Sequence, residues 1–166
     1  MEEVIREELN VVRKVVEHAM VALDYLQKGQ EKEFLEATGE LYFESTKSEA
    51  RTAIKYVKLV IIQLFNLKYT RDNNHEYFKD EIHESMINII DITNWDMEKK
   101  VDPVIELINQ DMNLAYARAI REFQRILEKN PEDYKINSTK NLPEECPWTL
   151  ENIMDDPIED LLIVLK

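Results

Sequence analysis

Glycine is almost absent from this chain, and this absence limits the possible folds more than any other feature. Only Gly29 and Gly39 occur among 166 residues, together with five prolines. Sheet proteins need turn residues at short intervals, because each hairpin reverses the chain within a few residues. The sequence therefore predicts an all-α protein. The length fits one domain, and a hydrophobic share of 44% is enough to build a core without disulfides or metal.

Apolar residues spaced alternately three and four positions apart predict the helices. Five long stretches follow one another, over residues 2–28, 31–45, 48–69, 75–93 and 103–129. Gly29 lies where a helix C-cap is expected. The segment Thr46–Glu49 matches a capping box, which favours a bend or a short break between the second and third stretches. Asp102 and Pro103 are typical of a helix start, and Asn130-Pro131 ends the last stretch.

The same spacing assigns one face of each stretch to the core. In the first two stretches the predicted inward residues are Ile5, Leu9, Val12, Val16, Ala19, Leu23, Leu26, Phe34, Leu35, Leu41 and Tyr42. In the other three they are Ala50, Ala53, Ile54, Val57, Ile61, Leu64, Phe65, Phe78, Ile82, Met86, Ile89, Ile90, Ile105, Ile108, Met112, Ala115, Ala119, Phe123 and Ile126. Short loops between long helices favour an antiparallel up-and-down bundle of four to five helices.

The chain changes character after this bundle. Residues 131–148 hold three of the five prolines and show little periodicity, so we expect an extended strap across the bundle. Short helices are predicted near residues 150–154 and 158–165. Pro147 and Trp148 are expected to anchor the strap, with Cys146 beneath them as a small apolar residue. The predicted organisation is one domain, 1–166, made of a bundle (1–130) and a C-terminal strap with short helices (131–166).

Charge and cysteine content indicate where such a protein works. Acidic residues number 34 and basic residues 21, and a net charge of −13 repels phosphate backbones at long range. We therefore expect no DNA partner and consider RNA a poor candidate. One cysteine excludes an internal disulfide and fits a reducing compartment. The acidic start resembles no signal peptide, and the apolar run Val57–Leu67 is too short to span a bilayer, so we expect no membrane partner and a cytoplasmic location.

Two basic stripes stand out against this acidic background. They recur at helical spacing and comprise Lys47, Arg51, Lys55 and Lys58 in one stretch and Arg118, Arg121, Arg125 and Lys129 in another. Each stripe is suited to an anion or an acidic partner, or else pairs with acidic residues on neighbouring helices such as Glu40, Glu44 and Glu122. Two stripes that lie on adjacent helices would favour the binding interpretation.

Two weaker patterns suggest catalysis. Arg71 and His75 resemble the Arg and His at a helix start in ribonuclease domains of the "higher eukaryote and prokaryote nucleotide-binding" type, although the gap is shorter here. In that interpretation the Arg steadies a phosphate and the His acts as acid or base. Glu76, Asp80 and His83 share one helix face, as metal ligands in bundles do. Ordinary polar surface explains both patterns as well, and we expect no bound cofactor.

The C-terminal residues form an amphipathic turn. Ile158, Leu161, Leu162 and Leu165 fall on one side of a short helix. A free apolar tail is a liability for a protein in water, so another surface must cover it. The tail docks either on its own bundle or on a second subunit.

The segment 142–151, with Cys146-Pro147-Trp148 after a proline and before a short acidic helix, resembles the end of a bacterial family. This family is the domain of unknown function number 29, common in cyanobacteria. Gly29, the glutamate pair Glu40 and Glu44, and Ala117-Arg118 agree with it, and the resemblance covers about residues 20–155. Gln63 stands where the family usually has His, and Phe78-Lys79 near its usual Trp-Arg. The resemblance implies a helical fold and carries no activity, cofactor or catalytic residue.

These observations favour a non-catalytic interaction or regulatory protein with a protein partner, or one that self-associates through its tail. A regulatory protein that masks a basic partner is one form of this hypothesis, because an acidic surface attracts basic proteins. The alternative is a helical-bundle ribonuclease or metal-binding enzyme that uses Arg71 and His75, or Asp80 and His83.

Overall fold

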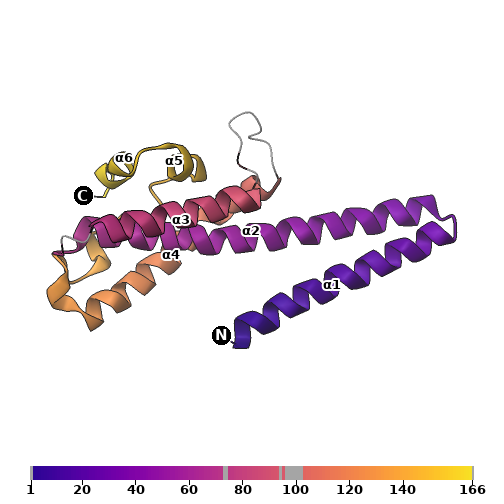
Figure 1. Ribbon diagram of the computed structural model, residues 1–166, viewed down its shortest axis with the longest axis horizontal. Helices are drawn as coiled ribbons and strands as arrows, with labels where there is room; N and C mark the ends of the chain where they lie inside the picture. The colour runs from indigo at the N-terminus through magenta and orange to yellow at the C-terminus, as the bar shows by residue number, and fades with distance from the viewer. Residues whose placement is uncertain (1, 73–74, 94, 96–102, 166) are drawn as a thin grey trace. The chain divides into compact units, whose positions relative to one another are not determined.

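A computed structural model describes residues 2–72, 75–93, 95 and 103–165, with side chains from residue 13 onward in these ranges. The long helices of this part of the chain are α1 (Glu2–Gln27), α2 (Glu31–Tyr69), α3 (His75–Thr93) and α4 (Pro103–Lys129) (Figure 1). Shorter ones follow as η1 (Pro131–Asp133), η2 (Thr139–Asn141), α5 (Leu150–Asp155) and α6 (Ile158–Ile163). No strand occurs within these described ranges apart from an isolated bridge between Thr70 and Tyr134. The predicted all-α bundle class is confirmed.

The chain divides into two compact units. The first unit comprises residues 1–49 and the second residues 50–166, so α2 contributes residues to both. The boundary differs from the expected one near residue 130, and the expectation of one domain stays a prediction. Within the described residues, no helix is both long and apolar enough to cross a bilayer.

The first unit is a helical hairpin whose turn depends on Gly29. The amide of Gly29 donates to the carbonyl of Leu26 at 3.1 Å, and the amide of Gln30 donates to that of Tyr25 at 3.0 Å. These two bonds define a Schellman motif, which needs a left-handed residue at the position after the C-cap. Gly29 provides it with a φ of 69°. The predicted C-cap is therefore confirmed.

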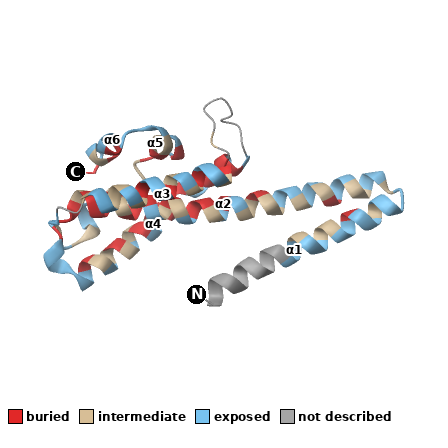
Figure 2. Ribbon diagram, in the orientation of Figure 1, coloured by how far each residue is buried: buried red, intermediate tan, exposed pale blue. Residues whose placement is uncertain are grey.

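The predicted inward face of this hairpin is largely wrong. Val16, Leu23 and Leu26 are exposed, as are Leu35 and Tyr42, the latter two at 67% and 64%. The buried apolar residues are instead small, namely Ala22 and Ala37. Within this unit only two helices pair, and a pair of helices buries a narrow strip on each partner. Figure 2 shows that exposed and half-buried residues predominate in the hairpin, whereas buried residues are more frequent in the second unit. The side chains of Ile5, Leu9 and Val12 lie outside the described residues.

The expected short break near residue 46 does not occur, because α2 is continuous from Glu31 to Tyr69. The observed element is one long helix, and the alternative of a bend within it stays a prediction. The capping box does not form. Thr46 Oγ1 donates to the Tyr42 carbonyl, one turn back, at 2.8 Å, and Ser45 Oγ donates to Glu49 Oε1 at 3.1 Å. Both hydroxyls therefore find partners within the helix and have no need to cap a new one.

The second unit is built around the C-terminal half of α2. Its predicted inward residues, from Ala50 to Phe65, are all buried. In Figure 1, α3 runs back along α2 in the opposite direction, and α4 returns in the same direction as α2. Rings link the parallel pair, with the Phe65 centroid 5.2 Å from Phe123 and 6.0 Å from Tyr116. The up-and-down order of the last three long helices follows the prediction.

Two details of the other long helices differ from expectation. On α3, Ile90 is exposed at 40%, while Ser85 and Thr93 are buried. The buried stripe is centred on Ile82 and Ile89, and Ser85 and Thr93 lie on that line. Burial of Thr93 is possible because its hydroxyl donates to the Ile89 carbonyl at 2.7 Å. On α4, every predicted inward residue is buried except Ile126, which is half-buried. Asp102, the expected N-cap, lies outside the described residues.

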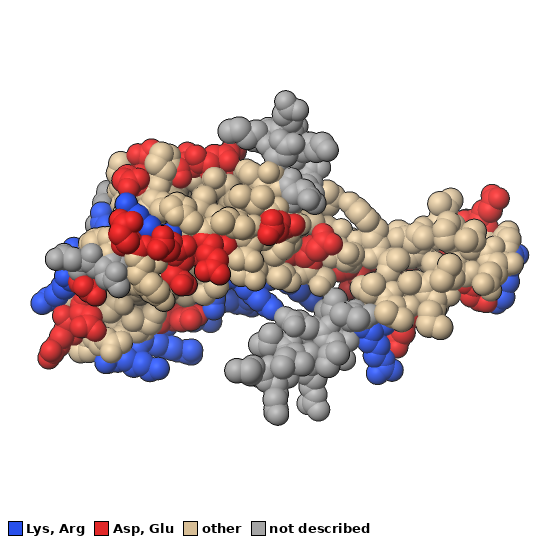
Figure 3. Space-filling view, viewed as in Figure 1, with Lys and Arg blue, Asp and Glu red and all other residues tan. Residues whose placement is uncertain are grey.

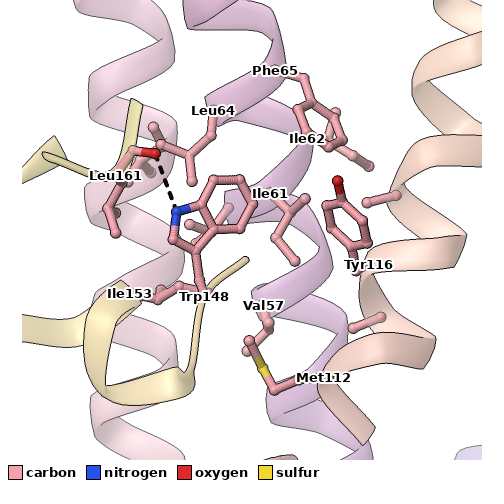
Figure 4. Close-up of a cluster of buried hydrophobic side chains, with 14 of the residues drawn as sticks. Val57, Ile61, Ile62, Leu64, Phe65, Met112, Tyr116, Trp148, Ile153 and Leu161 are labelled. Atoms are coloured by element: carbon pink, nitrogen blue, oxygen red, sulfur yellow. Dashed lines mark hydrogen bonds between the residues drawn. The ribbon is translucent and has the colours of Figure 1, made fainter. Parts of the chain in front are cut away.

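Trp148 anchors the C-terminal strap, as predicted. Figure 4 shows its ring among side chains of α2, α4, α5 and α6. The indole Nε1 donates to the Leu161 carbonyl at 3.1 Å, and the ring centroid lies 6.2 Å from that of Tyr116. One side chain therefore joins the central helices to α6. The two predicted short helices are confirmed as α5 and α6.

The two glycines should respond to substitution in opposite directions. Gly29→Ala forces a Cβ into a left-handed position and should destabilise the hairpin by about 1 kcal/mol. Gly39 is helical with no atom within 4 Å of an added Cβ, so Gly39→Ala should stabilise the hairpin by about 1 kcal/mol. Native-state hydrogen exchange of the first-unit amides measures both. If both substitutions stabilised the hairpin, or both destabilised it, the roles assigned to Gly29 and Gly39 would be wrong.

Trp148 and Trp95 provide a matched pair for testing the anchor. Trp148→Phe leaves the Leu161 carbonyl without its donor in a buried site and should cost about 2 kcal/mol of unfolding free energy. The Trp95 indole donates to Asp155 Oδ1 at 3.0 Å in an exposed position, so Trp95→Phe should cost less than about 1 kcal/mol. Urea unfolding followed by circular dichroism at 222 nm compares them. Equal losses would show that Trp148 does not anchor the strap.

Candidate functional site: a basic face on α2 and α4

The two basic stripes predicted from sequence lie on neighbouring helices. Lys58 Nζ on α2 contacts Glu122 Oε2 on α4 at 2.7 Å. Lys55 and Arg51 precede Lys58 by three and seven positions, so they extend along the same side of α2. Arg118 and Arg125 flank Glu122 by four and three positions on α4. The ion pair therefore brings the stripes together. We define the basic face as Arg51, Lys55, Lys58, Arg118, Arg121 and Arg125.

Most of this basic face is open to solvent. Arg51, Lys55 and the three arginines are exposed, and Lys58 is partly buried beside its partner. No acidic residue occurs from Ala50 to Arg71 in a chain that has 34 of them. In the view of Figure 3, Lys and Arg gather along the lower edge of the second unit, on the side of α4. Cations are thus concentrated locally on a protein with a net charge of −13.

Two predicted members of the stripes differ from the rest. Lys47 belongs to the first unit, where its Nζ lies 3.9 Å from the Phe43 ring centroid and 3.7 Å from Glu44 Oε1. The Lys47 ammonium group therefore contacts residues of the first unit. Lys129 is exposed at the last residue of α4, where a cation complements the helix dipole. We do not include either residue in the basic face.

Arg71 is held by hydrogen bonds to the strap. Its amide donates to the Asp133 carbonyl at 2.8 Å, and its Nε donates to the Tyr134 carbonyl at 2.8 Å. Arg71 lines a cavity together with Lys135 and Lys140, and His75 is not among the described residues that line it. Neither lysine was among the candidate site residues predicted from the sequence. The available signal was a stretch without acidic residues, 134–143, that contains them.

The metal candidates lie on the solvent-exposed side of α3. Glu76, Asp80 and His83 are all exposed on α3. The glutamates considered as further ligands have other neighbours in the first unit, because Glu40 lies 3.8 Å from His18 Nε2 and Glu44 lies beside Lys47. Within the described ranges, no three His, Cys, Asp or Glu side chains converge on a point suited to an ion.

The apolar tail docks on its own unit. Leu161 and Leu165 are buried, and Leu162 is partly buried against the same core. Lys68 Nζ donates to the Leu162 carbonyl at 3.1 Å, and Lys79 Nζ lies 3.2 Å from Glu159 Oε1. The pKa of Glu159 is lowered mainly by a hydrogen bond from its own backbone amide, and the contact with Lys79 lowers it further. Self-association through these leucines would first require α6 to leave this position.

Cys146 is partly buried beneath the strap, in the position that the packing interpretation predicts. Its Sγ lies 3.3 Å from the Trp148 carbonyl, and its amide donates to Asn113 Oδ1 at 2.9 Å. Burial raises the pKa of the thiol to about 11, and the hydrogen bond to Trp148 offsets only part of that rise. Nearby, burial also raises the pKa of Tyr116, whose hydroxyl donates to the Pro143 carbonyl at 3.0 Å.

Cys146 should therefore react slowly with alkylating reagents. The thiolate is the reactive form, and a pKa of about 11 in place of 9.0 lowers its share roughly 100-fold at pH 8. We expect iodoacetamide to modify the folded protein at least 100-fold more slowly than the protein in urea, by mass spectrometry. Above pH 9 the folded-state rate should keep rising after the unfolded-state rate has levelled off. Similar rates at pH 8 would show that the thiol is accessible and unperturbed.

Comparison with known proteins places the second unit in a recognised family. The family model for the "Domain of unknown function DUF29" matches residues 43–158. The match begins later than the sequence resemblance indicated, so Gly29 and Glu40 lie outside it. No curated protein and no solved structure matches the chain. The matched region covers more than half of the chain, and the protein therefore belongs to the DUF29 family.

Proposed function

We propose that this protein is a non-catalytic interaction protein that binds an acidic surface of a protein partner through its basic face. The observation that carries the proposal is the ion pair between Lys58 and Glu122, because it brings two stripes of cations from distant parts of the sequence onto adjacent helices. A partly exposed ion pair at the surface contributes only about 0–1 kcal/mol to stability. Stability alone thus gives little reason to concentrate cations here.

The charge distribution supports an acidic protein as the partner. Glu122 is paired with Lys58, and five of the six cations of the basic face are exposed to solvent. A nucleic acid extends well beyond such a face and meets the rest of a protein whose net charge is −13. A protein partner needs to match only the face itself, and charge complementarity then guides its approach and orientation.

The form of the basic face supports binding rather than catalysis. Its side chains are long cations spread along the outer sides of two helices, and five of the six are exposed. Acid–base catalysis needs a titrating group held within hydrogen-bonding distance of the substrate, in a site that positions both. Spread-out cations instead suit the contact of one broad surface with another.

Site-specific crosslinking in the native cells tests this proposal. A photoreactive residue at Arg121 should capture a protein with an acidic surface, and the same residue at Glu84, which is exposed on α3, should not capture that protein. With the partner purified, Arg118→Glu/Arg125→Glu should weaken binding at least about tenfold at low salt. Raising the ionic strength should weaken the wild-type complex as well, because salt screens exposed charges.

A control with the same change in charge is available in the first unit. Lys14→Glu/Lys32→Glu alters two exposed cations outside the basic face and should leave the affinity within about twofold of wild type. If both double variants weakened partner binding equally, the effect would depend on net charge alone. That result would contradict binding through a defined face. Capture of RNA rather than protein at Arg121 would also overturn the proposal.

A further inference from the structure

We propose that the cavity beside Arg71 is a binding site for a small phosphate ester, separate from the basic face. The cavity has a volume of about 510 Å³ and lies where the end of α2 meets the strap. Ligand sites of small molecules range from about 300 to 1,000 Å³. The volume of the cavity falls within the range of small-molecule sites.

The cavity is cationic in an acidic protein. Arg71, Lys135 and Lys140 line it, and no Asp or Glu is among the described residues that do so. None of these three side chains forms an ion pair with a carboxylate in the part of the chain that the structure describes. Lys135 contacts the end of α2 through its backbone amide, which donates to the Tyr69 carbonyl at 2.7 Å. Its ammonium group is not used in that contact.

The walls of the cavity are held in place before any ligand arrives. The bridge between Thr70 and Tyr134 joins the end of α2 to the strap, and the Tyr134 hydroxyl donates to Asn66 Oδ1 at 2.9 Å. On the other side, Thr139 donates to Gln124 Oε1 of α4 through its amide at 3.0 Å and its hydroxyl at 3.1 Å. A site whose backbone is already ordered loses less conformational entropy on binding.

The orientation of Arg71 suits an anion with several oxygens. Its Nε is occupied by the Tyr134 carbonyl at 2.8 Å, which fixes the plane of the guanidinium. The terminal nitrogens remain as a pair of donors, and such a pair matches the oxygens of a phosphate group. Two lysines supply further charge, and a phosphate monoester carries close to two negative charges at neutral pH.

Besides the apolar Pro131 and Ile136, the lining holds polar residues that can select the rest of the ligand. Asn137, Ser138 and Asn141 provide amide and hydroxyl groups along the cavity, and these groups pair with hydroxyls better than with apolar surface. The Ser138 hydroxyl already accepts a hydrogen bond from the Lys140 amide at 3.2 Å and still has a proton to donate. The geometry thus points to a phosphorylated polyol or sugar as the ligand class.

NMR titration tests the cavity directly, with glycerol 3-phosphate as the probe and ¹H–¹⁵N spectra of the full chain as the readout. We expect saturable shifts of the amides from Lys135 to Asn141, and no shifts with glycerol. Lys135→Gln/Lys140→Gln should weaken binding at least about tenfold, because each charge-assisted hydrogen bond is worth about a factor of ten or more. Arg121→Gln/Arg125→Gln removes the same charge from the basic face and should change the affinity less than about twofold.

Several outcomes would overturn the assignment. Shifts that do not saturate, or that appear on α4 instead of the strap, would show that the cavity is not the site. If the two double variants weakened binding of glycerol 3-phosphate equally, the effect would depend on net charge and not on the cavity. Inorganic phosphate that binds as tightly as glycerol 3-phosphate would show that the cavity does not recognise an ester. Each variant alters exposed residues, and circular dichroism verifies its fold. The result is independent of whether the basic face binds a protein.

Discussion

Burial of the C-terminal half of α2 on nearly all sides is the constraint on which the rest of the second unit depends. From Val60 to Thr70, only Gln63 and Lys68 are not buried. A helix that is apolar around most of its circumference must be covered by several elements at once. Helices α3 and α4 cover part of it, and the strap covers more through Trp148 and Tyr134. The strap, which looks irregular in the sequence, is therefore a structural layer of the unit.

Burying the end of a helix creates a second requirement, because its polar groups lose water. Asn66 and Thr70 are both buried. The Tyr134 hydroxyl donates to the Asn66 side chain, and the bridge to Tyr134 pairs the backbone of Thr70. Lys68 reaches the Leu162 carbonyl and so helps to hold α6 in place. Satisfying these groups brings residues 134–141 beside Arg71. The cationic cavity thus follows from how the unit closes the end of its central helix.

Local patterns predicted the second unit well and the first unit poorly. The periodicity from Ala50 to Phe65 identified buried residues correctly because helices surround this segment on several sides. The same periodicity around Val16 and Leu23 indicated a core face that the structure leaves exposed. An amphipathic stripe shows that a helix has an apolar side, but coverage of that side depends on elements distant in the sequence. The capping-box pattern at Thr46 had a similar weakness, since a hydroxyl serves a helix interior as well as a helix start.

Local sequence patterns were enough to predict the helical class, most of the helix ends and Trp148 as an anchor. These properties depend on residues close together in the chain, such as Gly29 after α1 and the Pro103 that begins α4. Only the folded structure shows that Lys58 contacts Glu122, so that two stripes form one basic face, and that Arg71 lines a cavity with Lys135 and Lys140. The physical reason is separation along the chain. These groups lie about sixty to seventy positions apart, and only packing around α2 brings them together.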